Sequence, residues 1–202
     1  MRFSFRWLYL VVGLATFAPA GAATVMVFGD SLSAAYGLAP EQGWVALMQT
    51  ELGTKHRVVN ASLSGETTAG GLSRLPQALA THQPDVVVIE LGANDGLRGL
   101  PIVAMQDNLA KMIELSRRAG ARPVLVGMAL PPNYGPQYTA KFQASFKTLA
   151  ERERVPLVPF LFDGFAADRT RFQNDGIHPN AAAQPRMRDN VLRVLRPLLA
   201  KS

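Results

Sequence analysis

The sequence contains no cysteine among its 202 residues. Disulfide bonds, a cysteine nucleophile and metal sites built on thiolates are therefore excluded. Histidine is also scarce, with three residues in the chain. A chain of this length can bury a substantial core, so we expect one globular domain that is stabilised by apolar packing alone.

Apolar runs long enough to cross a bilayer, about 20 residues, are lacking as well. The run at Trp7–Ala18 follows two arginines and precedes small residues with A-x-A spacing. This order is typical of a secretory signal peptide. We therefore expect residues 1–22 to be a cleaved leader, residues 23–202 to be a single domain, and the mature protein to be periplasmic or secreted. A retained membrane anchor is the alternative.

Basic runs interleaved with aromatic residues are also missing. The formal net charge is +6, but the 21 lysines and arginines are scattered along the chain. Such a surface gives no support for nucleic-acid binding, although it could favour anionic substrates or lipid headgroups. We expect a small-molecule substrate, no nucleic-acid partner, at most transient contact with membrane lipid, and a monomer.

Apolar segments of strand length alternate with longer segments of helical period. Strands are predicted at residues 24–29, 57–60, 86–91, 123–128 and 155–158, and helices near residues 43–52, 70–81, 102–119, 138–154 and 181–199. Most of the strands are continuous β-branched or leucine runs, as expected where helices cover both faces of a sheet. The alternation implies right-handed crossovers, so we predict a single α/β domain built on a parallel sheet.

Polar segments occur next to the predicted strands, at the edge where open parallel sheets form their sites. Gly29, Asp30 and Ser31 follow the first strand, NASLSGETTAGG includes the end of the second, GANDG follows the third, and NDGIHPN precedes the last helix. Short turns often use glycine, asparagine and aspartate for backbone reasons alone. Each segment is therefore a weak signal when it is taken by itself.

Together the segments meet the requirements of acyl transfer. A serine hydroxyl becomes a nucleophile when an imidazole takes its proton and a carboxylate orients the imidazole, roles that Ser31, His178 and Asp175 could fill. The oxyanion of the intermediate needs hydrogen-bond donors, which Gly65 and Asn94 could supply beside the Ser31 backbone. The alternative interpretations are a helix cap and a turn histidine for the pair, a left-handed turn for the glycine and an Asx-turn for the asparagine.

The remaining polar residues are expected to be structural. We interpret Asp30 as a turn and helix-cap residue rather than as the acid that orients the imidazole. His56 and His82 have no acidic partner of this kind, and we expect both on solvated helix ends or turns.

Three other classes of protein are compatible with parts of the pattern. An α/β-hydrolase would carry G-x-S-x-G, but GDSLS lacks the second glycine. A metal-dependent phosphoesterase could use Asp30, Asn94, Asp95 and His178 around a divalent ion, but such a site needs more ligands than three scattered histidines provide. A non-catalytic lipid or peptide carrier would keep a pocket without needing serine, acid and base together.

The four blocks GDSLS, SLSGETTAGG, GANDG and DGIHP occur in the order found in the SGNH or GDSL hydrolases, and the sequence resembles that family over almost the whole mature chain. The resemblance implies a three-layer α/β/α sandwich with a five-stranded parallel sheet of the flavodoxin-like kind. It implies Ser31 as nucleophile, His178 as base and Asp175 as acid, with the Ser31 backbone, Gly65 and Asn94 as the oxyanion hole. It implies neither a cofactor nor a metal.

Within the family, the leader, the chain length and the segments GWVALMQ, VIELGANDGLRG and LPPNYG are similar to the bacterial periplasmic thioesterase, lysophospholipase and arylesterase group. We therefore predict hydrolysis of aryl esters, acyl-CoA and lysophospholipids. An acyl groove is expected at Leu97, Leu100, Leu130 and Pro131, on loops that glycines at 96, 99 and 135 could hinge. A carbohydrate O-acetyl esterase of the same fold is the alternative.

Overall fold

The computed structural model describes residues 21–200, so most of the predicted leader and the last two residues lie outside the described part. Within that range no helix is both long and apolar enough to cross a membrane. The strands are β1 (Thr24–Gly29), β2 (Arg57–Asn60), β3 (Val86–Glu90), β4 (Arg122–Val126) and β5 (Leu157–Val158). The α-helices are α1 (Trp44–Leu52), α2 (Thr68–His82), α3 (Ala93–Leu97), α4 (Ile102–Arg118), α5 (Pro136–Glu153) and α6 (Gln184–Leu199).

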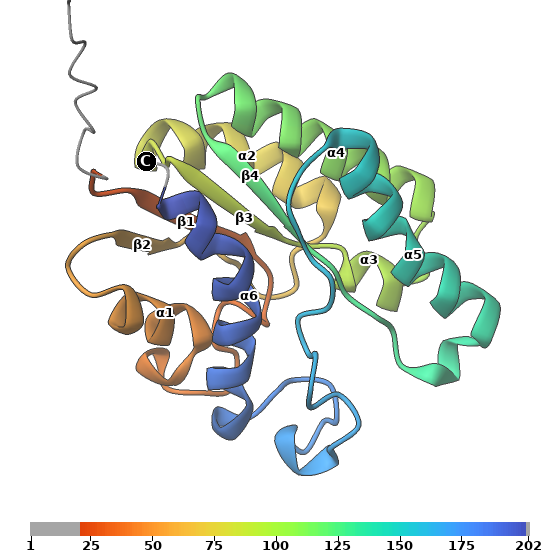
Figure 1. The fold of residues 1–202 in the computed structure, drawn as a ribbon. Helices are drawn as coiled ribbons and strands as arrows, with labels where there is room; N and C mark the ends of the chain where they lie inside the picture. Colours follow the sequence, from red (N-terminus) through yellow and green to blue (C-terminus); the bar gives the residue numbers. More distant parts are fainter. Residues whose placement is uncertain (1–20, 201–202) are drawn as a thin grey trace, which may run out of the picture.

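The five strands form one sheet in the order β2-β1-β3-β4-β5, and every neighbouring pair is parallel (Figure 1). The prediction of a five-stranded parallel sheet is therefore confirmed. The chain passes from β1 to β2 on one side and then to β3 on the other side of β1, so the winding direction changes between β1 and β3. Flavodoxin-like sheets form their sites at this switch point, outside the carboxyl ends of the strands.

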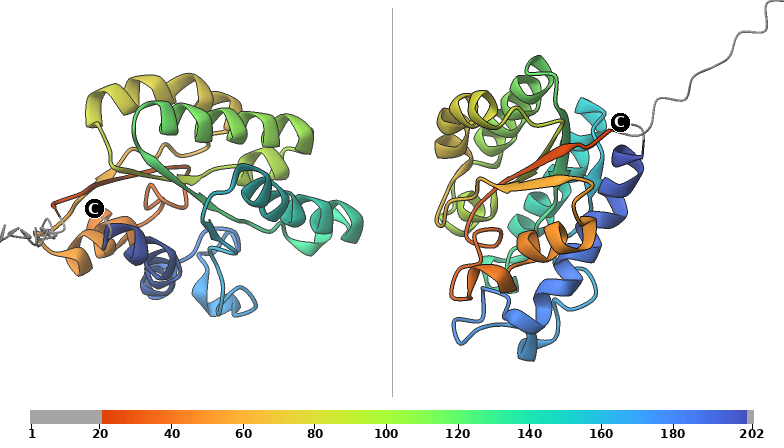
Figure 2. Two further views of the ribbon diagram at one scale, coloured as in Figure 1. Left: turned by 45° about the horizontal axis from the view of Figure 1, so that its top comes forward. Right: turned by 90° about the vertical axis from the view of Figure 1, so that its left-hand side faces the viewer.

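Helices cover both faces of the sheet, which gives the predicted three layers. Figure 2 shows α2, α4 and α5 on one face and α1 and α6 on the other. The short α3 lies at the carboxyl edge, directly after β3.

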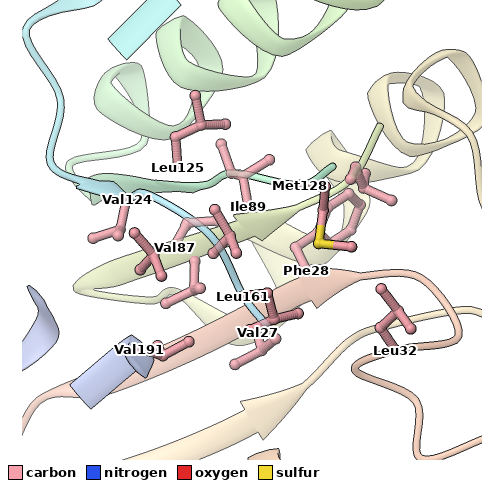
Figure 3. Close-up of a cluster of buried hydrophobic side chains, with 14 of the residues drawn as sticks. Val27, Phe28, Leu32, Val87, Ile89, Val124, Leu125, Met128, Leu161 and Val191 are labelled. Carbon is pink, nitrogen blue, oxygen red and sulfur yellow. The ribbon is translucent and has the colours of Figure 1, made fainter. Parts of the chain in front are cut away.

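The core lies on both sides of the central strands. Val27 and Phe28 of β1 and Val87 and Ile89 of β3 are fully buried, and Figure 3 shows them among side chains of β4, α6 and the loops. Strands buried on both faces lose water from every side chain, at about 25 cal/mol per Å² of apolar surface, and this is why their sequences do not alternate. The core thereby fixes the strand ends that carry the site.

The ends of several elements differ from the prediction for local reasons. The side chain of Thr67 accepts a hydrogen bond from the Gly70 backbone N–H, so α2 begins at Thr68 rather than near residue 70. Only two of the four residues predicted for the last strand pair in the sheet. Prolines at 156 and 159 flank this pair and cannot donate to a ladder. The helix α3 was not predicted, because five residues are too few to show a helical period.

The prediction for His56 was wrong. The side chain lies in a turn, as expected, but it is buried, and its Nδ1 accepts a hydrogen bond from the Ala23 backbone N–H at 3.2 Å. Burial, together with the nearby charge of Lys55, lowers the pKa of His56. His82 is the last residue of α2 and is half-buried.

Candidate active site

Ser31 lies in the turn that leaves β1 at the carboxyl edge of the sheet. The backbone N–H of Ala34 donates to the Asp30 carbonyl at 2.9 Å, and that of Tyr36 donates to the Ser31 carbonyl at 3.2 Å. The Asp30 carboxylate accepts from the Leu32 backbone N–H at 3.0 Å, which is the turn role predicted for this residue, although no helix follows. These bonds leave the Ser31 side chain half-buried at the surface of the crevice.

The predicted acid and base meet Ser31 from the far end of the chain. His178 Nε2 lies 2.9 Å from Ser31 Oγ, and His178 Nδ1 lies 2.7 Å from Asp175 Oδ2. The second carboxylate oxygen of Asp175 accepts from the backbone N–H groups of Ile177 and His178, each at 2.9 Å. The structure therefore brings together a hydroxyl, an imidazole and a carboxylate in the order that nucleophilic acyl transfer requires.

Electrostatics keep the Asp175 carboxylate charged. Partial burial would raise its pKa, but the two backbone N–H donors, the His178 side-chain hydrogen bond and the His178 charge outweigh this and lower the pKa below the usual value. An ionised carboxylate accepts a hydrogen bond from the Nδ1–H group of the imidazole. Nε2 then carries no proton and can accept the hydrogen bond of the Ser31 hydroxyl.

Side chains that the sequence did not single out hold the two loops against each other. The Tyr36 ring packs on the His178 ring, with centroids 4.5 Å apart. Gln173 Nε2 donates to the Tyr36 carbonyl at 2.8 Å, and the Gln173 backbone N–H donates to the His178 carbonyl at 2.8 Å. Neither Tyr36 nor Gln173 belongs to a charged or nucleophilic pattern, so no chemical signal in the sequence marks them.

The three predicted oxyanion donors follow β1, β2 and β3: Ser31 and Gly65 lie on loops, and Asn94 lies in the short helix α3. Gly65 has φ of +78°, a conformation that favours glycine. The backbone N–H groups of Ser31 and Gly65 donate to no partner within the part of the chain that the structure describes. Asn94 Nδ2 donates one hydrogen to Asp30 Oδ2 at 3.0 Å and has a second hydrogen to offer.

Arg98 connects the Gly65 and Asn94 segments and was missed by the sequence analysis. Its guanidinium donates to the Gly65 carbonyl at 2.9 Å. Because Arg98 is the residue after α3, it ties the left-handed turn at Gly65 to the segment that carries Asn94.

The geometry disfavours the metal site considered from the sequence. Asp95, one of the four ligands in that hypothesis, is buried and turned to α2, where it accepts from the Thr68 backbone N–H at 2.8 Å and from Thr68 Oγ1 at 2.5 Å. Asp30 is bonded to Asn94. Among residues 21–200, no three histidine, aspartate or glutamate side chains are grouped so that they could hold a metal ion.

The residues expected to line an acyl groove do not share one environment. Leu130 is buried, and its Cδ2 lies 2.8 Å from the place where a Cβ on Gly96 would stand, so it packs in the core rather than on an open wall. Leu97 and Pro131 are half-buried, whereas Leu100 is exposed. The expectation that Leu130 lines an acyl groove therefore does not fit its burial.

The loops after β3 and β4 are also tied to each other. The hydroxyl of Tyr134 donates to the Leu97 carbonyl at 3.0 Å, and that of Tyr138 donates to the Gly96 carbonyl at 3.3 Å. A Cβ at position 96 would stand 2.6 Å from the Phe142 ring. Gly96 is therefore a packing position, and the hinge proposed for it has no support from its contacts.

Two buried carboxyl groups lie beneath the Ser31 turn. Glu90, the last residue of β3, has no exposed surface, and Asp30 is 1% exposed. Burial raises the pKa of Asp30 to about 6, with a further rise from Asp95, against opposing effects of the Leu32 N–H, the Asn94 amide and the His178 charge. Burial, together with the charge of Asp30, raises the pKa of Glu90 well above its usual value. Both carboxyl groups of the pair are therefore harder to ionise than exposed ones, and Glu90, which is wholly buried, is the more strongly affected.

Comparison with known protein families gives one match that spans most of the chain. Residues 27–185 match the GDSL-like Lipase/Acylhydrolase family.

Individual relatives are similar over nearly their full length. The esterase TesA of Pseudomonas aeruginosa is 52% identical over 183 residues, which cover 89% of this chain and 91% of that protein. A crystal structure of TesA gives a TM-score of 0.84 and covers 87% of this chain and 99% of that one. The thioesterase 1/protease 1/lysophospholipase L1 of Escherichia coli K12 is 42% identical over 197 residues, which cover 96% and 95%.

A further solved structure is that of the psychrotrophic esterase EstA from Pseudoalteromonas sp., inhibited by monoethylphosphonate. It is 42% identical, has a TM-score of 0.83 and covers 88% of this chain and 98% of that one. Relatives of this similarity and coverage confirm both the fold predicted from the sequence and the resemblance on which that prediction depended.

Proposed function

Because this chain belongs to the GDSL-like Lipase/Acylhydrolase family, we propose that it is a serine hydrolase that cleaves carboxylic esters and thioesters through an acyl-enzyme on Ser31. The observation that carries the proposal is the continuous path from Ser31 Oγ to His178 Nε2 at 2.9 Å and from His178 Nδ1 to Asp175 Oδ2 at 2.7 Å. A turn histidine with a capping aspartate would not need to face a serine from the opposite end of the chain.

The reaction begins when Ser31 Oγ attacks the carbonyl carbon and His178 Nε2 takes the hydroxyl proton. The tetrahedral intermediate collapses as the imidazolium returns this proton to the leaving alcohol or thiol. A water molecule then enters the same position, gives its proton to His178 and attacks the acyl-enzyme. Expulsion of Ser31 Oγ, which takes the proton back, releases the carboxylic acid and restores the site.

The negative charge of each intermediate falls on the carbonyl oxygen. The backbone N–H groups of Ser31 and Gly65 and the second hydrogen of the Asn94 amide are the donors available at this edge of the sheet. Losing one such donor typically raises the barrier by about 3 kcal/mol. The Arg98 bond to the Gly65 carbonyl restrains the peptide next to one of these donors.

An apolar acyl chain suits the surface around the site. Within residues 21–200 the exposed large hydrophobic side chains are Tyr36, Leu63, Leu100, Val103 and Ile177. Leu63 and Ile177 lie in the blocks SLSGETTAGG and DGIHP, and Tyr36 lies just after GDSLS, where its ring packs on His178. Leu100 and Val103 lie just after GANDG, Val103 in the first turn of α4. Each methylene of a chain that these side chains cover contributes up to about 0.8 kcal/mol of binding.

Lysophospholipids and exogenous esters are the proposed physiological substrates. The relatives are described as an esterase and as a thioesterase and lysophospholipase, so esters and thioesters are both within the range of close homologues. If residues 1–22 direct secretion, cytosolic acyl-CoA would not meet the enzyme, even though it could be cleaved in vitro. Extraction of a lysophospholipid requires transient contact with a membrane surface.

The test is hydrolysis of p-nitrophenyl esters by the purified protein before and after treatment with an organophosphonate. We expect full inactivation, a stable adduct on Ser31 in peptide mass spectra, and no effect of EDTA. Ser31→Ala should abolish turnover and adduct formation, whereas Ser73→Ala, at an exposed serine of α2, should change neither. Activity that survives in Ser31→Ala, or that EDTA removes, would refute the mechanism.

Chain length discriminates between the proposed substrates and the carbohydrate O-acetyl esterase alternative. We expect kcat/KM for p-nitrophenyl esters to rise from two carbons towards medium chains and to remain high up to sixteen. A steep preference for acetate with rejection of longer chains would favour the deacetylase.

A further inference from the structure

Glu90 is a buried acid that the proposed reaction does not use. It is the last residue of β3, and its Cα is the register partner of Gly29, the last residue of β1. Its side chain therefore extends beneath the first residues of the nucleophile turn. A charged residue type with no exposed surface at this place is unusual, because burying an acid is costly unless its polar atoms gain partners.

The partners of Glu90 belong to the nucleophile turn. Ser33 Oγ donates to Glu90 Oε2 at 2.6 Å, and the Asp30 backbone N–H donates to the same oxygen at 3.4 Å. Ser31 lies between these two residues. One carboxyl group on the neighbouring strand therefore holds the main chain before the nucleophile and a side chain after it.

Gly29 permits this close approach. A Cβ at position 29 would stand 2.6 Å from Glu90 Oε2, 2.8 Å from Ser33 Oγ and 3.0 Å from the Glu90 carbonyl. No heavy atom can occupy that space, so the Glu90 carboxyl reaches the turn only because residue 29 has no side chain.

Asp30 extends the connection to the oxyanion hole. Its backbone N–H contacts Glu90, while its carboxylate holds Asn94 Nδ2 at 3.0 Å. One hydrogen of the amide is used in this bond, which fixes the direction of the other.

We propose that Glu90 is a positioning residue: its carboxyl group fixes the nucleophile turn through Ser33 and Asp30, and through Asp30 it fixes the Asn94 amide. The proposal deepens the proposed function and rests on it, since it concerns the same site.

Simple structural support does not account for the full arrangement. Glu90 Oε1 is buried and has no hydrogen-bond partner in the described part of the chain. An unpartnered buried oxygen opposes folding, so the desolvation of Oε1 offsets part of the stability that the two bonds to Oε2 contribute. A residue whose polar group gains so little net stability, yet contacts both sides of the nucleophile, is better explained by the geometry it maintains.

The charges around Glu90 are consistent with this role. Asp30 is the charged group next to it, and His178 and Asp95 act on Asp30 from the other sides. Burial raises the pKa of Glu90 more than that of Asp30, so the charged form of the pair is favoured on Asp30. A carboxylate accepts the Asn94 amide more strongly than a neutral carboxylic acid does.

The test compares Glu90→Met, which keeps the length but removes both acceptors, with Glu90→Gln, which keeps an amide oxygen in the place of Oε2. We expect Glu90→Met to lower kcat about ten- to a hundredfold with KM within twofold, because small displacements of reacting groups have effects of this size. The rate of inactivation by an organophosphonate should fall in parallel. Glu90→Gln should restore kcat to within about threefold of the wild type, since hydrogen bonds of the same geometry remain.

Melting temperatures separate positioning from support. Glu90→Met should melt below the wild type, because the buried Ser33 hydroxyl and the Asp30 backbone N–H lose their acceptor, and its kcat should fall as well. Ser145→Ala is the matched control, because Ser145 is a buried serine of α5 that bonds the Phe142 carbonyl away from the site, and it should alter the melting temperature alone. If Glu90→Met does not fold, Ser33→Ala removes the same bond from the turn and should lower kcat with KM unchanged.

The outcomes distinguish the two proposals. Wild-type protein that fails to hydrolyse esters or to form the Ser31 adduct would overturn the proposed function. An active wild type together with a folded Glu90→Met protein of wild-type kcat, or a Ser33→Ala protein of wild-type kcat where Glu90→Met is unfolded, would overturn the role of Glu90 alone. Loss of activity in Glu90→Gln equal to that in Glu90→Met would also overturn it. The proposal attributes the effect to the hydrogen bonds from Ser33 and Asp30, and Glu90→Gln keeps an acceptor for both.

Discussion

Replacing Asp175 with asparagine tests the geometry of the site more sharply than removing the side chain. Asp175 Oδ1 accepts two backbone N–H groups at 2.9 Å, and Oδ2 faces His178 Nδ1 at 2.7 Å. An asparagine keeps one oxygen and replaces the other with an NH2 group. Its oxygen must face the two N–H donors, because the reversed amide would leave both unpaired at about 1–3 kcal/mol each.

The NH2 group of the asparagine then faces His178 Nδ1, which must become an acceptor. The ring proton moves to Nε2, 2.9 Å from Ser31 Oγ, so the imidazole can no longer take the hydroxyl proton. Other triads lose about 10⁴ in kcat through this change of tautomer, which corresponds to about 5 kcal/mol in the barrier. KM should change little, since the lost interaction acts in the transition state.

Steady-state kinetics on a p-nitrophenyl ester, together with a melting curve, measure this prediction. Asp168→Asn is the matched control, because the Asp168 carboxylate accepts from the Thr170 backbone N–H and hydroxyl in a similar turn without an imidazole. It should keep wild-type kcat. An Asp175→Asn protein that folds normally and keeps more than a tenth of wild-type kcat would refute the assignment of Asp175 as the acid.

Three further predictions follow from single contacts. Asn94→Ala should lower kcat by about 10²–10³ with little change in KM in steady-state assays, and an unchanged kcat would remove Asn94 from the oxyanion hole. Gly29→Ala should lower the free energy of unfolding in urea by about 1–3 kcal/mol, because its Cβ would overlap Glu90, and a neutral effect would contradict the close approach. The raised pKa of Asp30 should make the protein more stable below pH 4 than above its folded pKa of about 6, by about 3 kcal/mol from this group. Urea titrations at several pH values should show this contribution disappear in Asp30→Asn, and an equal pH dependence in both proteins would refute it.

The sequence was sufficient to predict the sheet and to select the serine, histidine and aspartate that the structure brings together, because both depend on local patterns. Buried parallel strands leave continuous apolar runs, and the polar blocks adjoin the ends of three of these runs. Asp175 and His178 are three positions apart, so their contact could also be predicted from the local sequence. The contact with Ser31 depended on the parallel sheet, which brings the carboxyl ends of its strands to one edge.

Features that depend on contacts distant in sequence could not be predicted in this way. The buried His56 accepts a hydrogen bond from Ala23, 33 positions earlier, and the buried Leu130 occupies space that a side chain at Gly96 would need. The pairing of Glu90 with the nucleophile turn requires β1 and β3 to be neighbours, which strand order alone decides. A single acid at the end of the apolar run VVVIE is the one local signal that marked this position.

The geometry of the site depends on bonds between loops as well as on the strand ends. The Asn94 amide reaches Asp30 across 64 positions of sequence, and Gln173 Nε2 reaches the Tyr36 carbonyl across 137. The strand ends fix where each loop starts, but they leave the positions of the loop side chains free to vary by several ångströms. Reacting atoms must be held more closely than that. Variants that remove these bonds should therefore reduce kcat strongly while they change the free energy of unfolding little. The core of the sheet remains intact when a loop shifts by a fraction of an ångström.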